Sequence, residues 1–156
     1  GNAMSDLLVT AISRKVIRDQ IASGLTTALV GLIKELAGYQ KANFEDLTPF
    51  VRVYGEGSDR GAQGGNSIGA LMTSYFYTAQ VWIPYTWTVA AWNESDAEDA
   101  MDAIEQKVAE WLAADHDGAS WHEIMYADRT RIAVLKTSTG KVYLVEDIPL
   151  QVRVFV

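Results

Sequence analysis

The sequence predicts one α+β domain: a mostly antiparallel sheet with a long hairpin, packed by an N-terminal helix and one central amphipathic helix. Apolar residues recur every three or four positions in the N-terminal part and again in a central acidic segment. Between these segments, residues 75–92 alternate between apolar and mixed side chains. The chain has 156 residues, 49% of them hydrophobic, so residues 1–156 are expected to form a single domain.

The N-terminal segment 5–37 is expected to be helical. Gly24 marks a point where this helix can divide in two, and Gly38 suits a C-cap because it lacks a Cβ atom. Residues 1–3 precede Met4 and are interpreted as remains of an expression tag. The apolar positions lie along one side of the expected helix: Leu8, Ile12, Val16, Ile17, Ile21, Leu25, Leu29, Leu32, Ile33 and Leu36.

A strand is expected over 48–55, where side chains alternate, and a flexible glycine-rich loop over 55–70. The loop does not fit a phosphate site. A Walker A motif needs Lys followed by Ser or Thr, whereas Asn66 and Ser67 follow Gly65. The dinucleotide fingerprint would need its last glycine one place earlier, and a helix after it.

The segment 75–92 is expected to be a half-buried strand in a long hairpin that projects from the body. Eighteen extended residues would span about 60 Å, which is too long for one uninterrupted strand in a small domain. Pro84 cannot donate a hydrogen bond to a neighbouring strand, so a bend or an edge is expected there. The apolar face is formed by the odd positions: Tyr75, Tyr77, Ala79, Val81, Ile83, Tyr85, Trp87, Val89 and Ala91.

Residues 93–114 predict the central amphipathic helix. Ser95 and Glu98 have the spacing of a capping box, and acidic residues in the first turn suit the positive end of the helix dipole. The expected buried stripe consists of Ala97, Met101, Ile104, Val108, Trp111 and Leu112.

The C-terminal part predicts two strands joined by a turn at 137–140. The first covers 129–135, and the second begins at Val142 and buries its even positions. Glu146 interrupts that apolar face, so a bulge or a change of partner strand is expected there. Pro149 predicts an edge or an irregular position.

Composition excludes several classes of function. The chain has no cysteine, which excludes disulfides, thiolate metal sites and cysteine nucleophiles. The net charge of −7 disfavours a nucleic-acid binder, although an acidic surface lets DNA pass without adhering. No apolar run has the roughly 20 residues of a membrane span, and no secretory signal is recognisable.

No residue set predicts catalysis. His116 and His122 lie among acidic residues in 115–123, but their spacing matches no standard zinc or calcium site, so a polar loop is expected. The carboxylates of 96–102 are explained by an exposed helix. We therefore expect no enzyme activity and no catalytic, cofactor-binding or metal-binding residues.

Three segments resemble the tail terminator proteins of long-tailed bacteriophages, the minor tail protein U-like family that includes the phage lambda terminator. They are "DLTPFVRVYGEG" (46–57), "YTWTVAAWNESDAEDAMDAIEQKV" (85–108) and "YLVEDIPLQVRVFV" (143–156). The resemblance implies a structural protein of the virion, present in the host cytoplasm during assembly. It implies a homo-oligomeric ring, a hexamer, that caps the tail tube, contacts the tube protein and the head–tail connector proteins, and lets DNA pass through its pore.

The residues expected at partner interfaces are Arg60, Gln63, Asn66, Trp82 and Trp92. Two alternatives remain open from the sequence. One is another head–tail connector or neck ring. The other is a non-viral carbohydrate- or ligand-binding module that uses Trp82 and Trp92, placed on the same face of the long strand.

Overall fold

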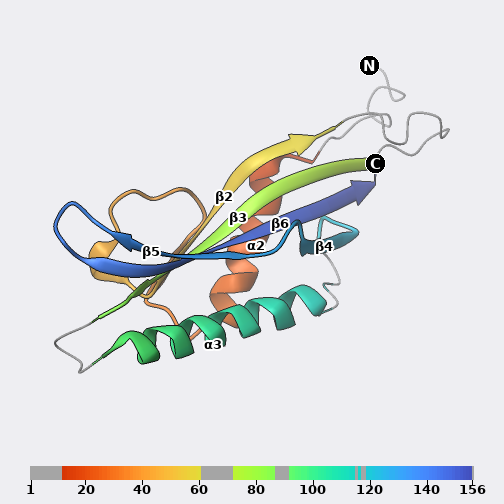
Figure 1. Ribbon diagram of the computed structural model, residues 1–156. Helices are drawn as coiled ribbons and strands as arrows, with labels where there is room; N and C mark the ends of the chain where they lie inside the picture. The colour runs from red at the N-terminus through yellow and green to blue at the C-terminus, as the bar shows by residue number, and fades with distance from the viewer. Residues whose placement is uncertain (1–11, 61–71, 87–91, 115, 117–118, 156) are drawn as a thin grey trace, which may run out of the picture.

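The computed structural model describes residues 12–60, 72–86, 92–114, 116 and 119–155. It confirms the α+β class: two α-helices pack against a mixed, mostly antiparallel sheet (Figure 1). The elements in chain order are α2 (Arg14–Ala28), β1 (Glu35–Ala37), the 3₁₀ helix η1 (Glu45–Leu47), β2 (Phe50–Asp59), β3 (Met72–Pro84), α3 (Glu94–Ala113), β4 (Glu123–Tyr126), β5 (Arg131–Lys136) and β6 (Val142–Phe155).

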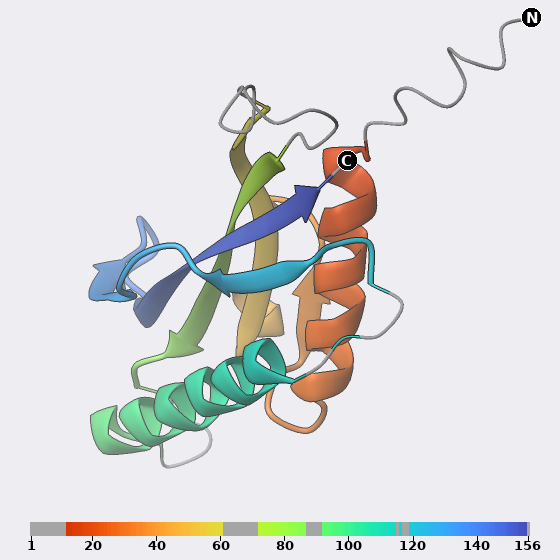
Figure 2. The same cartoon turned by 90° about the vertical axis from the view of Figure 1, so that its right-hand side faces the viewer.

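The sheet has the strand order β1-β2-β3-β6-β4, and β5 also pairs with β6. Among the described strand pairs, only β1–β2 is parallel. Both helices pack on the same face of the curved sheet, α2 along β2 and α3 across β3 and β6 (Figure 2). None of the described helices has the length and apolar character needed to cross a membrane.

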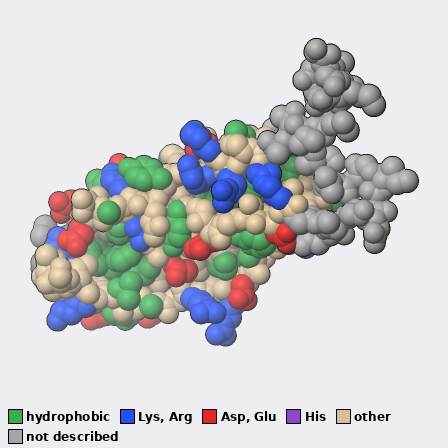
Figure 3. Space-filling view, turned by 90° about the horizontal axis from the view of Figure 1, so that it is seen from above, with side chains coloured by type: hydrophobic (Ala, Val, Ile, Leu, Met, Phe, Trp, Pro, Cys, Tyr) green, Lys and Arg blue, Asp and Glu red, His purple; other side chains and the backbone are tan. Residues whose placement is uncertain are grey.

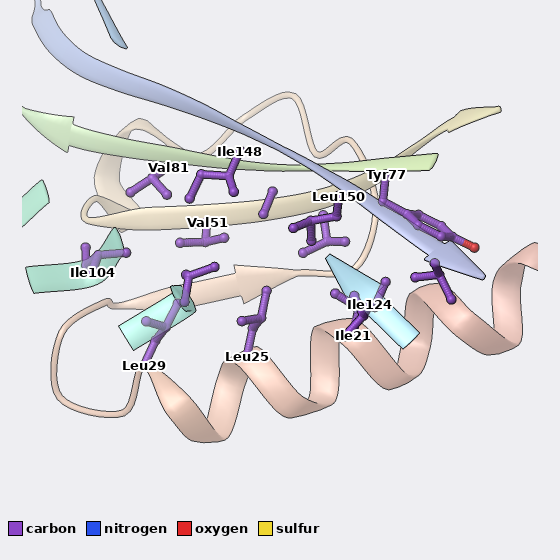
Figure 4. Close-up of a cluster of buried hydrophobic side chains, with 14 of the residues drawn as sticks. Ile21, Leu25, Leu29, Val51, Tyr77, Val81, Ile104, Ile124, Ile148 and Leu150 are labelled. Carbon is purple, nitrogen blue, oxygen red and sulfur yellow. The ribbon is translucent and has the colours of Figure 1, made fainter. Parts of the chain in front are cut away.

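The main core lies between the two helices and this face of the sheet (Figure 4). The odd positions of β3, from Tyr75 to Ile83, are buried there, as the alternation predicts. In α2 and its C-cap the buried residues recur every four positions, which keeps them on one side of the helix: Ile17, Ile21, Leu25 and the C-cap Leu29.

The N-terminal helix is shorter than predicted. Among the described residues it covers Arg14–Ala28 and ends with Leu29 as C-cap, so Gly38 is not its cap. Residues 35–37 form strand β1 instead of helix. Leu32, Ile33 and Leu36 still pack against the core, because a turn and a short strand can bury them as well as a helix can.

Gly24 does not divide the helix; it lies inside α2, where α3 crosses. A Cβ atom at this position would lie 2.5 Å from Cζ2 of Trp111, so only glycine lets the two helices approach this closely. The glycine that indicated a break in the sequence is therefore a packing residue.

Residues 55–59 of the predicted glycine-rich loop form strand instead. Strand β2 continues through Gly55 and Gly57 to Asp59, paired with β3. The register shifts between these two glycines, and Gly57 has a φ of 114°, so the bulge uses the left-handed backbone region that glycine adopts readily. The rest of the predicted loop, 61–70, lies outside the described residues.

The long strand is central rather than projecting. Strand β3 pairs antiparallel with β2 on one side and, along its whole length, with β6 on the other. The strand ends at Pro84, where the sequence predicts a bend or edge. Trp87, Val89 and Ala91 lie outside the described residues.

Helix α3 confirms the predicted stripe but not the predicted cap. Ala97, Met101, Ile104 and Val108 are buried, while Trp111 and Leu112 are partly buried against the same core. The capping box is formed by Asn93 and Asp96, two residues earlier than the Ser95–Glu98 pair. Asn accepts the N-cap hydrogen bond as well as Ser does, so the motif alone does not fix the register.

Candidate functional site

Strand β5 (Arg131–Lys136) is the most exposed regular element among the described residues: every one of its residues is exposed. It pairs with β6 and has no second partner strand in the described sheet. Its apolar side chains Ile132, Val134 and Leu135 are 58%, 52% and 41% exposed. An apolar edge strand of this kind is a template for association with another chain.

Both faces of β5 carry apolar side chains, which lie between the charged residues Arg131 and Lys136 at the two ends of the strand. Ile132 and Val134 lie opposite Glu146 and Leu144 of β6, and directly paired residues share a face, so they lie on the helix-covered side of the sheet. Leu135 lies opposite Tyr143, on the other side. Helix α3 packs against β3, β4 and β6, and it leaves the β5 side chains uncovered.

The position of β5 follows from a change of partner along β6. Residues Glu123–Tyr126 of β4 pair with Leu150–Arg153, and Arg131–Lys136 of β5 pair with Val142–Asp147. The edge chain advances by five residues from Tyr126 to Arg131, whereas the paired part of β6, from Leu150 to Asp147, advances by three. The edge chain therefore bulges beside Pro149, which has no N–H to donate. The bulge or change of partner expected at Glu146 therefore lies between Asp147 and Leu150, and Glu146 itself is regularly paired with Val81 and Ile132; strand β4 was not predicted.

A second exposed feature, the basic surface, comprises Arg14, Lys15 and Arg18 of α2 together with Arg60 after β2. These side chains lie around the start of α2, and the three from α2 line an open hollow of about 490 Å³ with Gly55, Gly57 and Tyr77. Several Lys and Arg side chains gather on the upper surface of the molecule (Figure 3). The basic surface gives an acidic protein one concentrated patch of positive charge.

Two tyrosines fix the start of α2 beneath the basic surface. The Tyr75 hydroxyl donates to the Ile12 carbonyl and the Tyr77 hydroxyl to the Arg14 carbonyl, both at 2.7 Å. Arg60 donates to the same Ile12 carbonyl at 3.2 Å and lies over the Tyr75 ring. Burial raises the pKa of Tyr77 far above its usual value, against the opposing effect of the nearby arginines, so its hydroxyl stays a hydrogen-bond donor.

The predicted interface residues are not brought together. Arg60 follows β2 at one end of the hairpin, while Trp82 pairs with Phe50 near the other end. Trp92 packs against the main core, and its indole donates to the Pro84 carbonyl at 2.8 Å. Gln63 and Asn66 lie outside the described residues.

The prediction that Trp82 and Trp92 share a face is wrong. Trp82 belongs to a small aromatic cluster with Phe44 and Phe50 on the sheet face opposite the helices, whereas Trp92 packs on the helix side. The alternation could not be extended to Trp92 because β3 ends at Pro84. The Trp82 indole is held by a 2.7 Å hydrogen bond to Gln80 and lies 5.7 Å from the Arg52 guanidinium carbon.

The histidines serve local contacts. The His116 ring lies 2.6 Å from the Trp111 carbonyl, and the His122 ring accepts from the Phe155 amide at 3.4 Å. No three metal-capable side chains converge within the described ranges, while Asp115 and Asp117 lie outside them. A polar hollow of about 420 Å³ near η1 contains charges that pair with each other, since Lys141 lies 3.6 Å from Glu45.

The fold and these surfaces define an α+β domain whose most distinctive exposed features suit contact with macromolecules. Comparison with known proteins does not assign the chain to a family, because no family model and no curated protein sequence matches it.

Sequence reasoning found the strand that becomes β5 but missed its exposure, and it missed the basic surface. The signal for the basic surface is present in the sequence. Arg14, Lys15 and Arg18 follow Ser13, which caps the helix, so three cations occupy the start of a helix where carboxylates are usual.

Proposed function

We propose that the chain is a structural protein of a bacteriophage virion: a tail terminator that assembles into a hexameric ring, caps the tail tube and joins the tail to the head. Strand β5 carries the proposal. Monomeric proteins protect edge strands with charge, proline or a covering segment. Here the edge presents apolar side chains on both faces, and contact with a second copy would remove them from water.

The ring, its partners and its place in the virion come from the sequence resemblance. In the proposed ring, each subunit contacts its neighbouring subunits, the tail tube protein and the head–tail connector proteins, first in the host cytoplasm and then in the virion. DNA passes through the pore, and a chain with net charge −7 suits this role because it repels the phosphate backbone.

A neck or other head–tail connector ring would use the same kind of surface for self-association. Such a ring differs from a tail terminator in the neighbouring ring of the virion to which it binds. A sugar-binding module is less well supported. Trp82 and Trp92 lie on opposite faces of the sheet and both contact other parts of the chain, so they do not form one platform for a sugar.

The test compares capping of tail tubes by three proteins. Tubes are polymerised from the tube protein of the same phage, and capped ends are counted by electron microscopy. Val134→Lys places a charge on the exposed edge, so it is expected to abolish capping and self-association while keeping the thermal midpoint of the wild type. Val30→Lys is the matched control, because Val30 is 77% exposed but lies after α2, away from β5.

Wild type and Val30→Lys are expected to cap the tubes equally. The proposal is contradicted if wild type leaves the tubes uncapped. If Val134→Lys caps the tubes as well as wild type does, the exposed edge of β5 no longer supports the proposal.

A further inference from the structure

Among the described residues, the arginines of the basic surface have no acidic partner. Within the described ranges, no carboxylate lies within 4.0 Å of Arg14, Arg18 or Arg60, and only Lys15 is paired, with Asp19 at 2.6 Å. The Nε atom of Arg18 is buried without a hydrogen-bond partner. Acidic residues outnumber basic ones by 20 to 13 in this chain, so the lack of pairing is not due to a shortage of carboxylates.

The place of these cations in α2 is locally unfavourable. The start of a helix carries partial positive charge, which repels Lys and Arg. Helix α2 has no acidic residue in its first turn to offset them. Sequences keep such local conflicts mainly where the residues serve a contact beyond the helix itself.

Helix α3 supplies the opposite charge. It contains seven carboxylates and one lysine, Lys107. Four exposed carboxylates form what we term the acidic face, and none of them lies within salt-bridge distance of a Lys or Arg in the described part of the chain. The acidic face consists of Glu94, Glu98, Asp99 and Asp102.

The two surfaces cannot meet within one chain. Gly24, in the second half of α2, contacts Trp111 in the last turn of α3. The basic surface lies at the other end of α2, which is about 22 Å long at 1.5 Å per residue. The acidic face lies at the other end of α3, which runs along the opposite side of the molecule (Figure 1).

We propose that the basic surface of one copy binds the acidic face of α3 of the next copy in the assembled ring. Contacts between two different surfaces are heterologous, and they close into a ring when the rotation between subunits permits. Opposite charges also guide the copies together and set their orientation. This inference rests on the proposed function, because it names the contact through which that ring forms.

The test is a charge-reversal exchange. The basic-reversed variant is Arg14→Glu with Arg18→Glu, and the acidic-reversed variant is Asp99→Arg with Asp102→Arg. In each variant alone the substituted positions face charges of the same sign, so its self-association is expected to weaken about 100-fold. Mixed in equal amounts, the two variants restore assembly, because each contact between different variants again pairs opposite charges.

Two control variants, a replacement variant and a salt series accompany the exchange. The chain that carries all four substitutions is expected to assemble like wild type. Lys34→Glu with Lys41→Glu makes the same change in net charge elsewhere and is expected to assemble normally. Arg14→Glu alone replaces the basic-reversed variant if circular dichroism shows that variant to be unfolded, because Arg14 is exposed. Raising salt from about 0.05 M to about 0.5 M is expected to weaken wild-type assembly.

The outcomes separate this inference from the proposed function. If wild type never assembles, the proposed function fails and the inference with it. If wild type assembles and the reversed variants do so equally well, or the mixture of weakened variants is not restored, the inference alone is overturned. It is also overturned if the basic-reversed variant assembles normally and has lost affinity for duplex DNA, since the surface would then bind phosphates.

Discussion

At the residue scale, Glu146 is the most unusual side chain of the core. It lies on the helix-covered face of β6 and is 3% exposed. Burial raises the pKa of its carboxyl group, and the negative charges of Glu105 and Asp102 on α3 act in the same direction. A hydrogen bond from Thr130 opposes them. The ionised carboxylate is therefore destabilised in the folded state.

Glu146→Gln is expected to raise the free energy of unfolding at pH 7, because the amide removes a buried charge and keeps the shape. A raised folded-state pKa means that the native protein binds more protons than the unfolded chain, so wild-type stability increases as pH falls from neutral towards 4.5. The advantage of the variant should shrink over that range. Urea unfolding at several pH values measures it; an advantage that grows with acid would contradict the assignment.

The burial of a single residue can be predicted only when the secondary structure around it is known, because the helix or strand sets how often buried positions recur. The buried positions of β3 could be predicted, because neighbouring side chains of a strand point to opposite faces. Trp92 was misplaced because the strand ends at Pro84, and a period has no meaning beyond the element that generates it. The role of Gly24 could not be predicted either, since it depends on Trp111, which is remote in the sequence.

At the element scale, helix α3 shows how closely a motif locates a helix end. The sequence contains two overlapping capping patterns, and the helix uses the one that starts at Asn93. The Asn93 side chain accepts from the Asp96 amide at 3.1 Å, and the Asp96 carboxylate accepts from the Asn93 amide at 2.9 Å. Both hydrogen bonds satisfy amides that the helix itself leaves unpaired.

Asn93→Ala is expected to lower the free energy of unfolding by about 1 kcal/mol, because it removes the N-cap acceptor. Ser95→Ala is the matched control and should change the stability little, since Ser95 lies inside the helix and is exposed. Chemical unfolding followed by circular dichroism measures both. A larger loss for Ser95→Ala would place the helix start where the sequence motif predicts it.

The short strands β1 and β4 escaped the sequence analysis for a physical reason. They have three and four residues, too few to establish an alternation, and their pairing depends on distant segments. The long elements α3, β3 and β6 could be predicted because each repeats its pattern several times. The end of α2 could not, because Leu32 and Leu36 fit a helical stripe although they lie in a turn and a strand.

At the scale of the whole molecule, the candidate surfaces are what the sequence reveals least. A strand was predicted over 129–135, but its exposure depends on the tertiary packing of α3, which contacts β3, β4 and β6 and leaves β5 uncovered. The basic surface combines α2 with a residue that follows β2, so it exists only once the chain is folded. Composition bears on function only by exclusion: a chain without cysteine has no cysteine chemistry.

These surfaces lie on different parts of one small domain, which suits a subunit that contacts its neighbours through three unlike surfaces. The β5 edge offers apolar area, and the basic surface and acidic face offer orientation. A molecule that acts in this way is defined by its closed assembly rather than by a cleft. The central claim is therefore that the chain forms a closed ring through its own surfaces.

Native mass spectrometry over a range of protein concentrations tests this claim most directly. The account predicts one assembled species at six times the chain mass of 17.2 kDa, with no larger species as concentration rises, because a closed ring leaves no free contact. A monomer at every concentration, or an open-ended series of masses, would contradict it.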